Sequence, residues 1–204
     1  NEHAAAFDAA GWSRGDGDAM VVVHPNNPDG CFWGAETVTA PFTIFDESFC
    51  DIAPTRSLIA LAGRPGTIVL KSFGKFWGLA GLRLGFAIGD PKMLATLAEQ
   101  LGPWPVSGPA LEIGARALED VAWAIATRRR LADDARRLDI LMGDHGQLIG
   151  GTDLFRLYDV GDATAFQARL AEAHIWSRRF PYSASWLRLG LPCSEDWARL
   201  EMAL

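Results

Sequence analysis

One lysine stands out in this sequence because lysine is rare in it and because of what surrounds this one. The chain contains only Lys71, Lys75 and Lys92, and Lys75 lies in the loop Gly74–Gly78, where a glycine precedes it and two aromatic residues follow it. A nucleotide-binding P-loop would need a glycine five residues before Gly74 and a hydroxyl residue after Lys75, and both are absent. An amine that is desolvated beside aromatic rings loses basicity and becomes a nucleophile, so this loop suits Schiff-base chemistry.

Other polar residues stand at the ends of predicted strands. Asn27 follows an apolar run at 20–23, Asp46 follows one at 42–45, Lys75 follows one at 66–70, and Arg83 precedes one at 84–88. Continuous apolar runs bounded by Pro, Asn and Gly are typical of buried parallel strands, and an open α/β sheet binds ligands at the carboxyl ends of such strands. Taken alone, Asn27 also fits an ordinary turn, and Asp46 also fits a loop cap.

These strands predict an α/β fold in which a large lobe with a mostly parallel sheet (1–145) precedes a small α+β lobe (146–204). After the first four strands the pattern turns helical, with one helix at 92–101 and a long one from 109 to about 142 that has room for a bend. The small lobe is predicted to contain strands at 154–160, 175–178 and 186–190, a helix at 163–173 and a last helix from 194.

Net charge, cysteine and histidine placement and the length of the apolar runs argue against several classes of protein. The formal net charge is −6, which disfavours nucleic acid as a partner. The basic run 128–130 is followed by acidic residues, as on a solvated helix face. The three cysteines are isolated and the four histidines form no ligand pair, so we expect neither disulfides nor a metal site, but a reducing, cytoplasmic location. The apolar runs are too short to span a membrane.

Four segments in order resemble the fold-type I pyridoxal phosphate (PLP)-dependent aminotransferase superfamily. Ser72–Phe86 resembles the cofactor-lysine segment, in which Ser or Thr precedes the lysine by three residues and Arg follows it by eight. The loop 25–30, the strand end 46–49 and the late segment 186–191 resemble three further motifs of that superfamily. The resemblance covers most of the chain and implies the superfamily's fold.

The resemblance also implies a role for each residue. Lys75 and Asp46 would be catalytic, with Lys75 attaching PLP and moving protons at the substrate Cα, and Asp46 keeping the pyridine nitrogen protonated. The cofactor would be bound by Asn27, Asp46, Ser72, Lys75 and Arg83, where Ser72 and Arg83 take its phosphate. The substrate would be bound by Arg188 at its α-carboxylate, by Arg178 at a phosphate if it carries one, and by Asn27.

Within the superfamily, the sequence most resembles the threonine-phosphate decarboxylases of cobalamin biosynthesis, with histidinol-phosphate aminotransferases second. The resemblance therefore implies a PLP-dependent lyase that decarboxylates L-threonine O-3-phosphate to aminopropanol phosphate. An aminotransferase acting on a phosphorylated amino acid is the alternative, because both reactions use the same binding groups. A non-catalytic effector module of a transcription regulator is a third interpretation.

The sequence departs from the superfamily pattern in places. Phe49 stands where many members carry a tyrosine, and His24 stands where they often have Asn. The N-terminal stretch that cradles the cofactor phosphate in members cannot be located, so we expect part of the N-terminal region to be missing. Members are homodimers, and we expect the same here, with Trp104 and its proline-flanked loop in the interface or the pocket wall.

Overall fold

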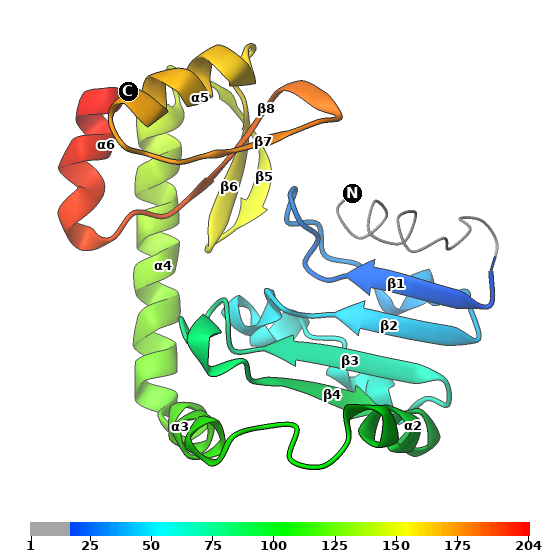
Figure 1. Ribbon diagram of the computed structural model, residues 1–204. Helices are drawn as coiled ribbons and strands as arrows, with labels where there is room; N and C mark the ends of the chain where they lie inside the picture. The colour runs from blue at the N-terminus through cyan, green and yellow to red at the C-terminus, as the bar shows by residue number, and fades with distance from the viewer. Residues whose placement is uncertain (1–16) are drawn as a thin grey trace. The chain divides into compact units, whose positions relative to one another are not determined.

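The computed structural model describes residues 17–204, which fold as two compact units. Among the described residues, the first unit comprises 17–27 together with Phe32–Gly114, and the second comprises Pro28–Cys31 together with Ala115–Leu204. Figure 1 shows a sheet with its own helices in each unit. Together they form the α/β fold that the sequence predicts.

The first unit is built on a four-stranded sheet in the order β1-β2-β3-β4. Its strands are β1 (Ala19–Val23), β2 (Phe42–Asp46), β3 (Thr67–Ser72) and β4 (Gly85–Gly89). β1, β2 and β3 are parallel neighbours, and β4 runs antiparallel to β3 (Figure 1). Val22, Phe45 and Val69 form the core of this sheet. All four predicted strands are confirmed within one or two residues at each end.

The connections in this unit are mostly short 3-10 turns. The connection between the parallel strands β1 and β2 contains a single such turn, Ala35–Thr37. Helix α2 (Pro91–Leu101) confirms the helix predicted at 92–101. Asp90 caps its N-terminus, because the Asp90 side chain accepts a hydrogen bond from the Lys92 backbone N–H.

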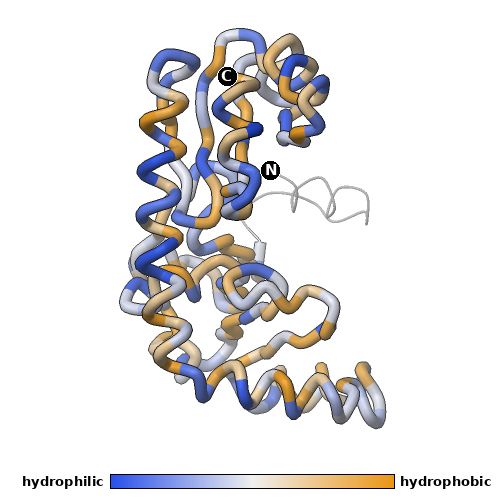
Figure 2. The backbone as a smooth tube through the Cα atoms, turned by 90° about the vertical axis from the view of Figure 1, so that its left-hand side faces the viewer, coloured by the Kyte–Doolittle hydropathy of each residue, from blue (hydrophilic) through white to orange (hydrophobic). Residues whose placement is uncertain are grey.

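The long helix predicted from 109 to 142 is two helices, α3 (Gly108–Glu119) and α4 (Val121–Met142). Asp120 separates them because it leaves helical geometry and caps α4 through the Trp123 backbone N–H at 2.9 Å. Figure 2 shows hydrophilic and hydrophobic residues alternating along α4. Its buried positions recur every three or four residues, and on its solvated side Arg130 pairs with Asp134 at 2.9 Å.

The second unit contains an antiparallel sheet in the order β5-β6-β8-β7. Its strands are β5 (Gln147–Thr152), β6 (Phe155–Asp159), β7 (Arg178–Phe180) and β8 (Ser183–Gly190), and its other helices are α5 (Ala163–Glu172) and α6 (Trp197–Ala203). α4, α5 and α6 supply the helical side of the core, which includes Leu138, Leu170 and Leu200 packed with Tyr158 and Leu187.

Two strands of this unit differ from the sequence-based prediction. β5 was not predicted, because its paired glycines Gly150 and Gly151 weaken the strand pattern. These glycines allow close backbone approach, and the Gly151 N–H donates to the Asp29 carbonyl at 2.7 Å. β7 begins at Arg178 instead of Ile175, because His174 (φ 59°) and Ile175 still belong to the turn that ends α5.

The units divide at Gly114, within α3, so that α4 groups with the second sheet. The lobes predicted at 1–145 and 146–204 correspond to a different division of the chain, and they stay a prediction. No helix among residues 17–204 combines the length and the apolar character needed to cross a lipid bilayer.

Candidate functional site

The first unit brings five of the predicted site residues to one edge of its sheet. Asn27 follows β1, Asp46 ends β2, and Ser72 ends β3 with Lys75 three residues beyond it. Arg83 reaches the same edge from the other direction, because β4 is antiparallel and Gly85 pairs with Ser72. This is the edge at which parallel sheets bind ligands.

Asp46 is held at the centre of this edge. It is paired in register with Val23 of β1 and Leu70 of β3, so it has a strand end on either side. One of its carboxylate oxygens, Oδ1, accepts hydrogen bonds from the backbone N–H of Ser48 at 3.0 Å and from the Ser48 hydroxyl at 2.5 Å. These bonds orient the carboxylate group before any ligand arrives.

The Lys75 loop is a compact turn anchored by buried aromatic rings. The Gly78 N–H donates to the Lys75 carbonyl at 3.0 Å, and Gly78 takes the left-handed conformation (φ 69°) that this turn requires. Phe73 and Phe76 are buried on either side of Lys75. The lysine side chain itself is exposed, so the desolvation predicted from its aromatic neighbours is wrong. Its Nζ lies 5.3 Å from the centroid of the Phe49 ring. The Phe49 position, where members of the superfamily often carry tyrosine, is therefore beside the lysine.

Ser72 and Arg83 flank this loop. The Ser72 hydroxyl oxygen accepts the Gly74 N–H at 3.1 Å, which leaves its own hydrogen available for donation. Arg83 is exposed and left-handed (φ 52°), and its Nη1 donates to the Ala80 carbonyl at 3.2 Å. Together the two side chains present hydroxyl and guanidinium donors of the kind that bind phosphate.

Asn27 lies between β1 and the segment Pro28–Cys31, which packs in the second unit. That segment is held closely, because a Cβ placed on Gly30 would lie 1.9 Å from the Gly151 carbonyl oxygen. Asn27 thus follows a strand of the sheet and precedes Asp29, whose carbonyl accepts the Gly151 N–H of β5.

The second unit carries the two predicted substrate arginines on neighbouring strands. Arg178 of β7 and Arg188 of β8 are directly opposite each other in the antiparallel register, so both side chains leave the same face of the sheet. The Arg188 guanidinium lies 5.2 Å from the centroid of the Phe155 ring. Arg179 points to the other face, where it donates to Gln167 at 2.7 Å and to Thr164 at 2.6 Å.

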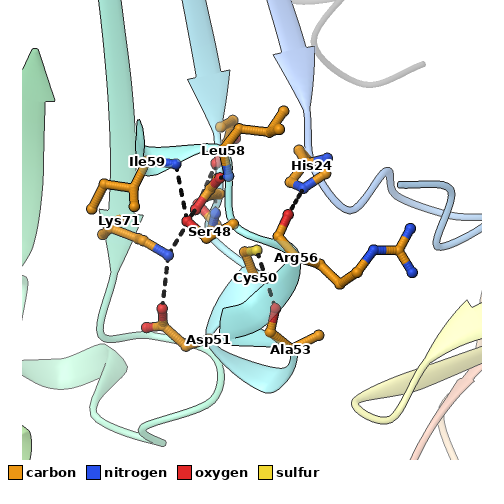
Figure 3. A network of polar contacts seen from close by, with 12 residues as sticks. His24, Ser48, Cys50, Asp51, Ala53, Arg56, Leu58, Ile59 and Lys71 are labelled. Atoms are coloured by element: carbon orange, nitrogen blue, oxygen red, sulfur yellow. Dashed lines mark hydrogen bonds and ion pairs between the residues drawn. The ribbon is translucent and has the colours of Figure 1, made fainter. Parts of the chain in front are cut away.

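A buried polar cluster next to Asp46, centred on Glu47, was not predicted from the sequence. Glu47 is fully buried and pairs with Lys71 at 2.8 Å, while its two oxygens also accept from the Ser57 hydroxyl and the Leu58 N–H, each at 2.6 Å (Figure 3). Burial by itself would lower the pKa of Lys71, but hydrogen bonding to Glu47 and the charge of Asp51 outweigh it and raise that pKa. The signal in the sequence was the presence of acidic residues directly after one predicted strand and of a lysine at the end of the next.

Three side chains of this region, His24, Glu47 and Cys50, have potential metal-ligand atoms within 4.8 Å of one another. Both ring nitrogens of His24 are already hydrogen-bonded, since Nδ1 accepts from the Trp33 N–H at 3.1 Å and Nε2 donates to the Arg56 carbonyl at 2.8 Å. Burial, followed by the charge of Glu47, raises the pKa of the Cys50 thiol to about 12. Since metals bind the thiolate, these three residues are better described as a structural cluster.

A pocket of about 250 Å³ lies in the second unit. His174, Trp176, Leu191, Asp196 and Arg199 are among its lining residues, and none of the predicted site residues lines it. The cofactor-binding residues predicted from the sequence therefore lie at the sheet edge of the first unit and not in this pocket.

Comparison with known proteins places these features in a family. The sequence model described as "Aminotransferase class I and II" matches residues 10–204. The threonine-phosphate decarboxylase of Pseudomonas aeruginosa is 44% identical over 92% of this chain and 60% of its own length. The enzyme of the same name from a Sinorhizobium species is 40% identical over 93% of this chain and 63% of its own length. The chain thus spans about three fifths of the length of these curated relatives.

Solved structures agree on the fold. The histidinol-phosphate aminotransferase of Sinorhizobium meliloti, crystallised in complex with pyridoxal-5'-phosphate, superposes with a TM-score of 0.80. The identity is 20%, and the match covers 98% of this chain and 58% of that one. At this identity the comparison supports the fold, while the roles of individual residues depend on the geometry described above.

Proposed function

This chain belongs to the aminotransferase class I and II family, and from that premise we propose that it is the PLP-binding part of a threonine-phosphate decarboxylase. The observation that carries the cofactor assignment is the convergence of Lys75, Asp46 and the phosphate-binding donors on one sheet edge. The two relatives described above carry the decarboxylase name at 44% and 40% identity.

The residues at the sheet edge fit PLP by their chemistry. Bound PLP acts as an electron sink for the carbanion that forms when a bond at the substrate Cα breaks. Lys75 would supply the amine that attaches the cofactor and would carry a proton at the substrate Cα. The Asp46 carboxylate would favour a protonated pyridine nitrogen, and Asn27 would donate to the phenolic oxygen of the ring. Ser72 and Arg83 would bind the phosphate.

The arginine pair of the second unit supports a substrate with two anionic groups. Arg178 and Arg188 are opposite each other in the register, so their guanidinium groups leave the same face of the sheet. A substrate that carries both a carboxylate and a phosphate would have a cation for each group, with Arg188 on the α-carboxylate and Arg178 on the phosphate. Arg179, which already donates to α5, is the less suitable phosphate ligand.

Decarboxylation and transamination differ in which Cα bond stands perpendicular to the cofactor ring. An enzyme that holds the carboxylate there releases carbon dioxide, and one that holds the hydrogen there forms a keto acid. The test is to incubate the full chain with threonine O-3-phosphate and PLP, and to measure carbon dioxide and keto acid in parallel.

Carbon dioxide without keto acid would support the lyase. Keto acid without carbon dioxide would replace the lyase with an aminotransferase of the histidinol-phosphate type. No turnover of threonine phosphate or histidinol phosphate, with PLP still bound, would instead favour a non-catalytic module.

We further propose a cytoplasmic homodimer that acts in cobalamin biosynthesis. Trp104, 92% exposed in a proline-flanked loop, is our candidate interface residue. Sedimentation equilibrium of Trp104→Asp should show loss of the dimer, whereas Trp176→Asp, which changes a tryptophan that is 83% exposed, should not. A Trp104→Asp protein that remains as dimeric as the Trp176→Asp protein would remove Trp104 from the interface.

A further inference from the structure

A chain of buried and partly buried polar contacts links the turn after Asp46 to the loop that carries Lys75. Both loops belong to the first unit, and Figure 3 shows its middle part, where Lys71 reaches toward Asp51. Glu47, next to Asp46, pairs with Lys71 Nζ at 2.8 Å, and the same Nζ donates to Asp51 Oδ1 at 3.0 Å. β3 is thereby tied through one lysine to two points of the segment that follows β2.

Asp51 also contacts the Lys75 loop. Its second oxygen, Oδ2, accepts a hydrogen bond from Trp77 Nε1 at 2.8 Å, and Trp77 is two residues beyond Lys75. The indole also stacks on Phe73, with ring centroids 5.5 Å apart and planes at 17°, and meets Phe76 edge-on at 5.1 Å. Trp77 is therefore held both by packing and by one directed bond.

The hydrogen bond from Trp77 to Asp51 fixes the position of the Lys75 loop relative to the segment after β2, which ring packing alone would not do. Stacked rings slide at small energetic cost, whereas a hydrogen bond to a partly buried carboxylate fixes both direction and distance. The Asp51 side chain is 19% exposed and that of Lys71 15%, so solvent weakens these contacts only in part. Phe49, between Asp46 and Asp51 in sequence, lies under Lys75 Nζ at 5.3 Å and closes the same ring of contacts.

We infer that Asp51 and Trp77 are positioning residues, which hold the Lys75 loop at a fixed place relative to the Asp46 carboxylate so that one cofactor meets both. The inference rests on the proposed function, because it takes PLP as the molecule that bridges the two groups. Lys71, on β3, holds Asp51 in place, and Glu47, which follows β2, in turn holds Lys71. Effective catalysis depends on such placement, since small displacements of a reacting group cost large factors in rate.

The test compares Trp77→Phe, which removes the indole N–H but keeps a stacking ring, with the unmodified full chain. Amide hydrogen exchange without PLP should accelerate about ten-fold or more at residues 74–79, because one bond to a charged acceptor is lost. With PLP added, the dissociation constant should rise by about ten-fold, and the pH midpoint of the visible absorption of lysine-bound PLP should shift.

The matched control is Trp33→Phe. It also removes an indole hydrogen bond, from Trp33 Nε1 to the Val23 carbonyl at 3.0 Å, in which neither Asp51 nor the Lys75 loop takes part. Exchange at 74–79 should be unchanged in this variant. Asp51→Asn provides a second variant, which keeps an acceptor oxygen but loses the charge, and it should give faster exchange at 74–79 than the unmodified chain does.

Two outcomes separate the inference from the proposed function. Unchanged exchange at 74–79 and an unchanged pH midpoint in both Trp77→Phe and Asp51→Asn would overturn the positioning role. Borohydride reduction that fails to fix PLP on Lys75 of the unmodified chain would overturn the proposed function. In that case the exchange data would still show whether Asp51 and Trp77 order the loop.

Discussion

The place of Lys75 at the sheet edge is set by its own loop and by one ring from another segment. The glycines around it permit the turn, the buried Phe73 and Phe76 anchor the turn to the unit, and the amine is left exposed at the sheet edge beside the Phe49 ring. An amine in this position can react with an aldehyde without moving the backbone. The loop therefore depends both on its own residues and on Phe49, which lies far from it in the sequence.

Lys75→Ala should abolish the visible absorption of bound PLP, because no other amine of the first unit lies in this loop. The fold should be preserved, since the side chain is exposed. The measurement is absorption spectroscopy with borohydride reduction and peptide mapping. Lys92→Ala, at an exposed position in the first turn of α2, is the control and should keep the chromophore. A reducible chromophore in Lys75→Ala would mean that another group binds the cofactor.

Arg188→Ala should raise the KM for threonine phosphate by about 100-fold, because a charge-assisted carboxylate contact is lost. PLP binding should stay near normal, since the cofactor residues belong to the first unit. Steady-state kinetics and PLP titration measure the two effects separately. Arg178→Ala should instead reduce the preference for threonine phosphate over threonine. Loss of PLP from Arg188→Ala would show that the arginine has been assigned to the wrong group.

At the scale of elements, close backbone approach explains why some glycines are required. Gly30 has a φ of 71°, and a Cβ there would meet the Gly151 carbonyl at 1.9 Å. Gly161 has nearly the same conformation, with a φ of 74°, but no atom within 4 Å of its Cβ position. The comparison separates the cost of the left-handed conformation from the cost of contact with β5.

Gly161→Ala should lower the unfolding free energy by about 1 kcal/mol, the cost of placing a side chain in the left-handed region. Gly30→Ala should cost clearly more, by about 2 kcal/mol or above, because β5 must move away. Urea unfolding followed by the signal of the second unit measures both values. Equal costs would show that the segment 28–31 is not held against β5 in solution.

For the molecule as a whole, the polar cluster next to Asp46 couples stability to pH. The Cys50 thiol is fully buried, and burial together with the nearby Glu47 charge raises its pKa from 9.0 to about 12. The unfolded chain therefore loses this proton at a lower pH than the folded chain does. Stability from this group is complete below pH 9 and is lost as the pH rises from 9 toward 12.

The unfolding free energy should accordingly fall by up to about 1.4 kcal/mol per pH unit above 9 through this group alone. Cys50→Ala should remove that part of the slope, and the difference in unfolding free energy between the two proteins should shrink or reverse at alkaline pH. Cys31→Ala, which changes an exposed cysteine, is the control and should keep the wild-type slope. Identical slopes for all three proteins would show that Cys50 ionises as readily in the folded chain as in the unfolded one.

Local pattern was enough to predict most elements of this chain. Apolar runs ended by Pro, Asn and Gly located β1, β2, β3 and β4, and the spacing of polar residues after them indicated a shared site edge. These predictions succeed because strand burial and turn formation depend on neighbouring residues. β5 was missed, and a single helix was expected where Asp120 divides α3 from α4, because backbone approach and capping at those points compete with the local pattern.

The sequence by itself determined which side chains could do chemistry here and on which strand ends they stand. Only the tertiary structure decided that β4 returns antiparallel to place Arg83 beside Ser72, that Arg178 faces Arg188 across two strands, and that Lys71 joins Glu47 to Asp51. The physical reason is that register and buried ion pairs arise between residues distant in sequence. Their energies depend on burial and distance, which no local pattern contains.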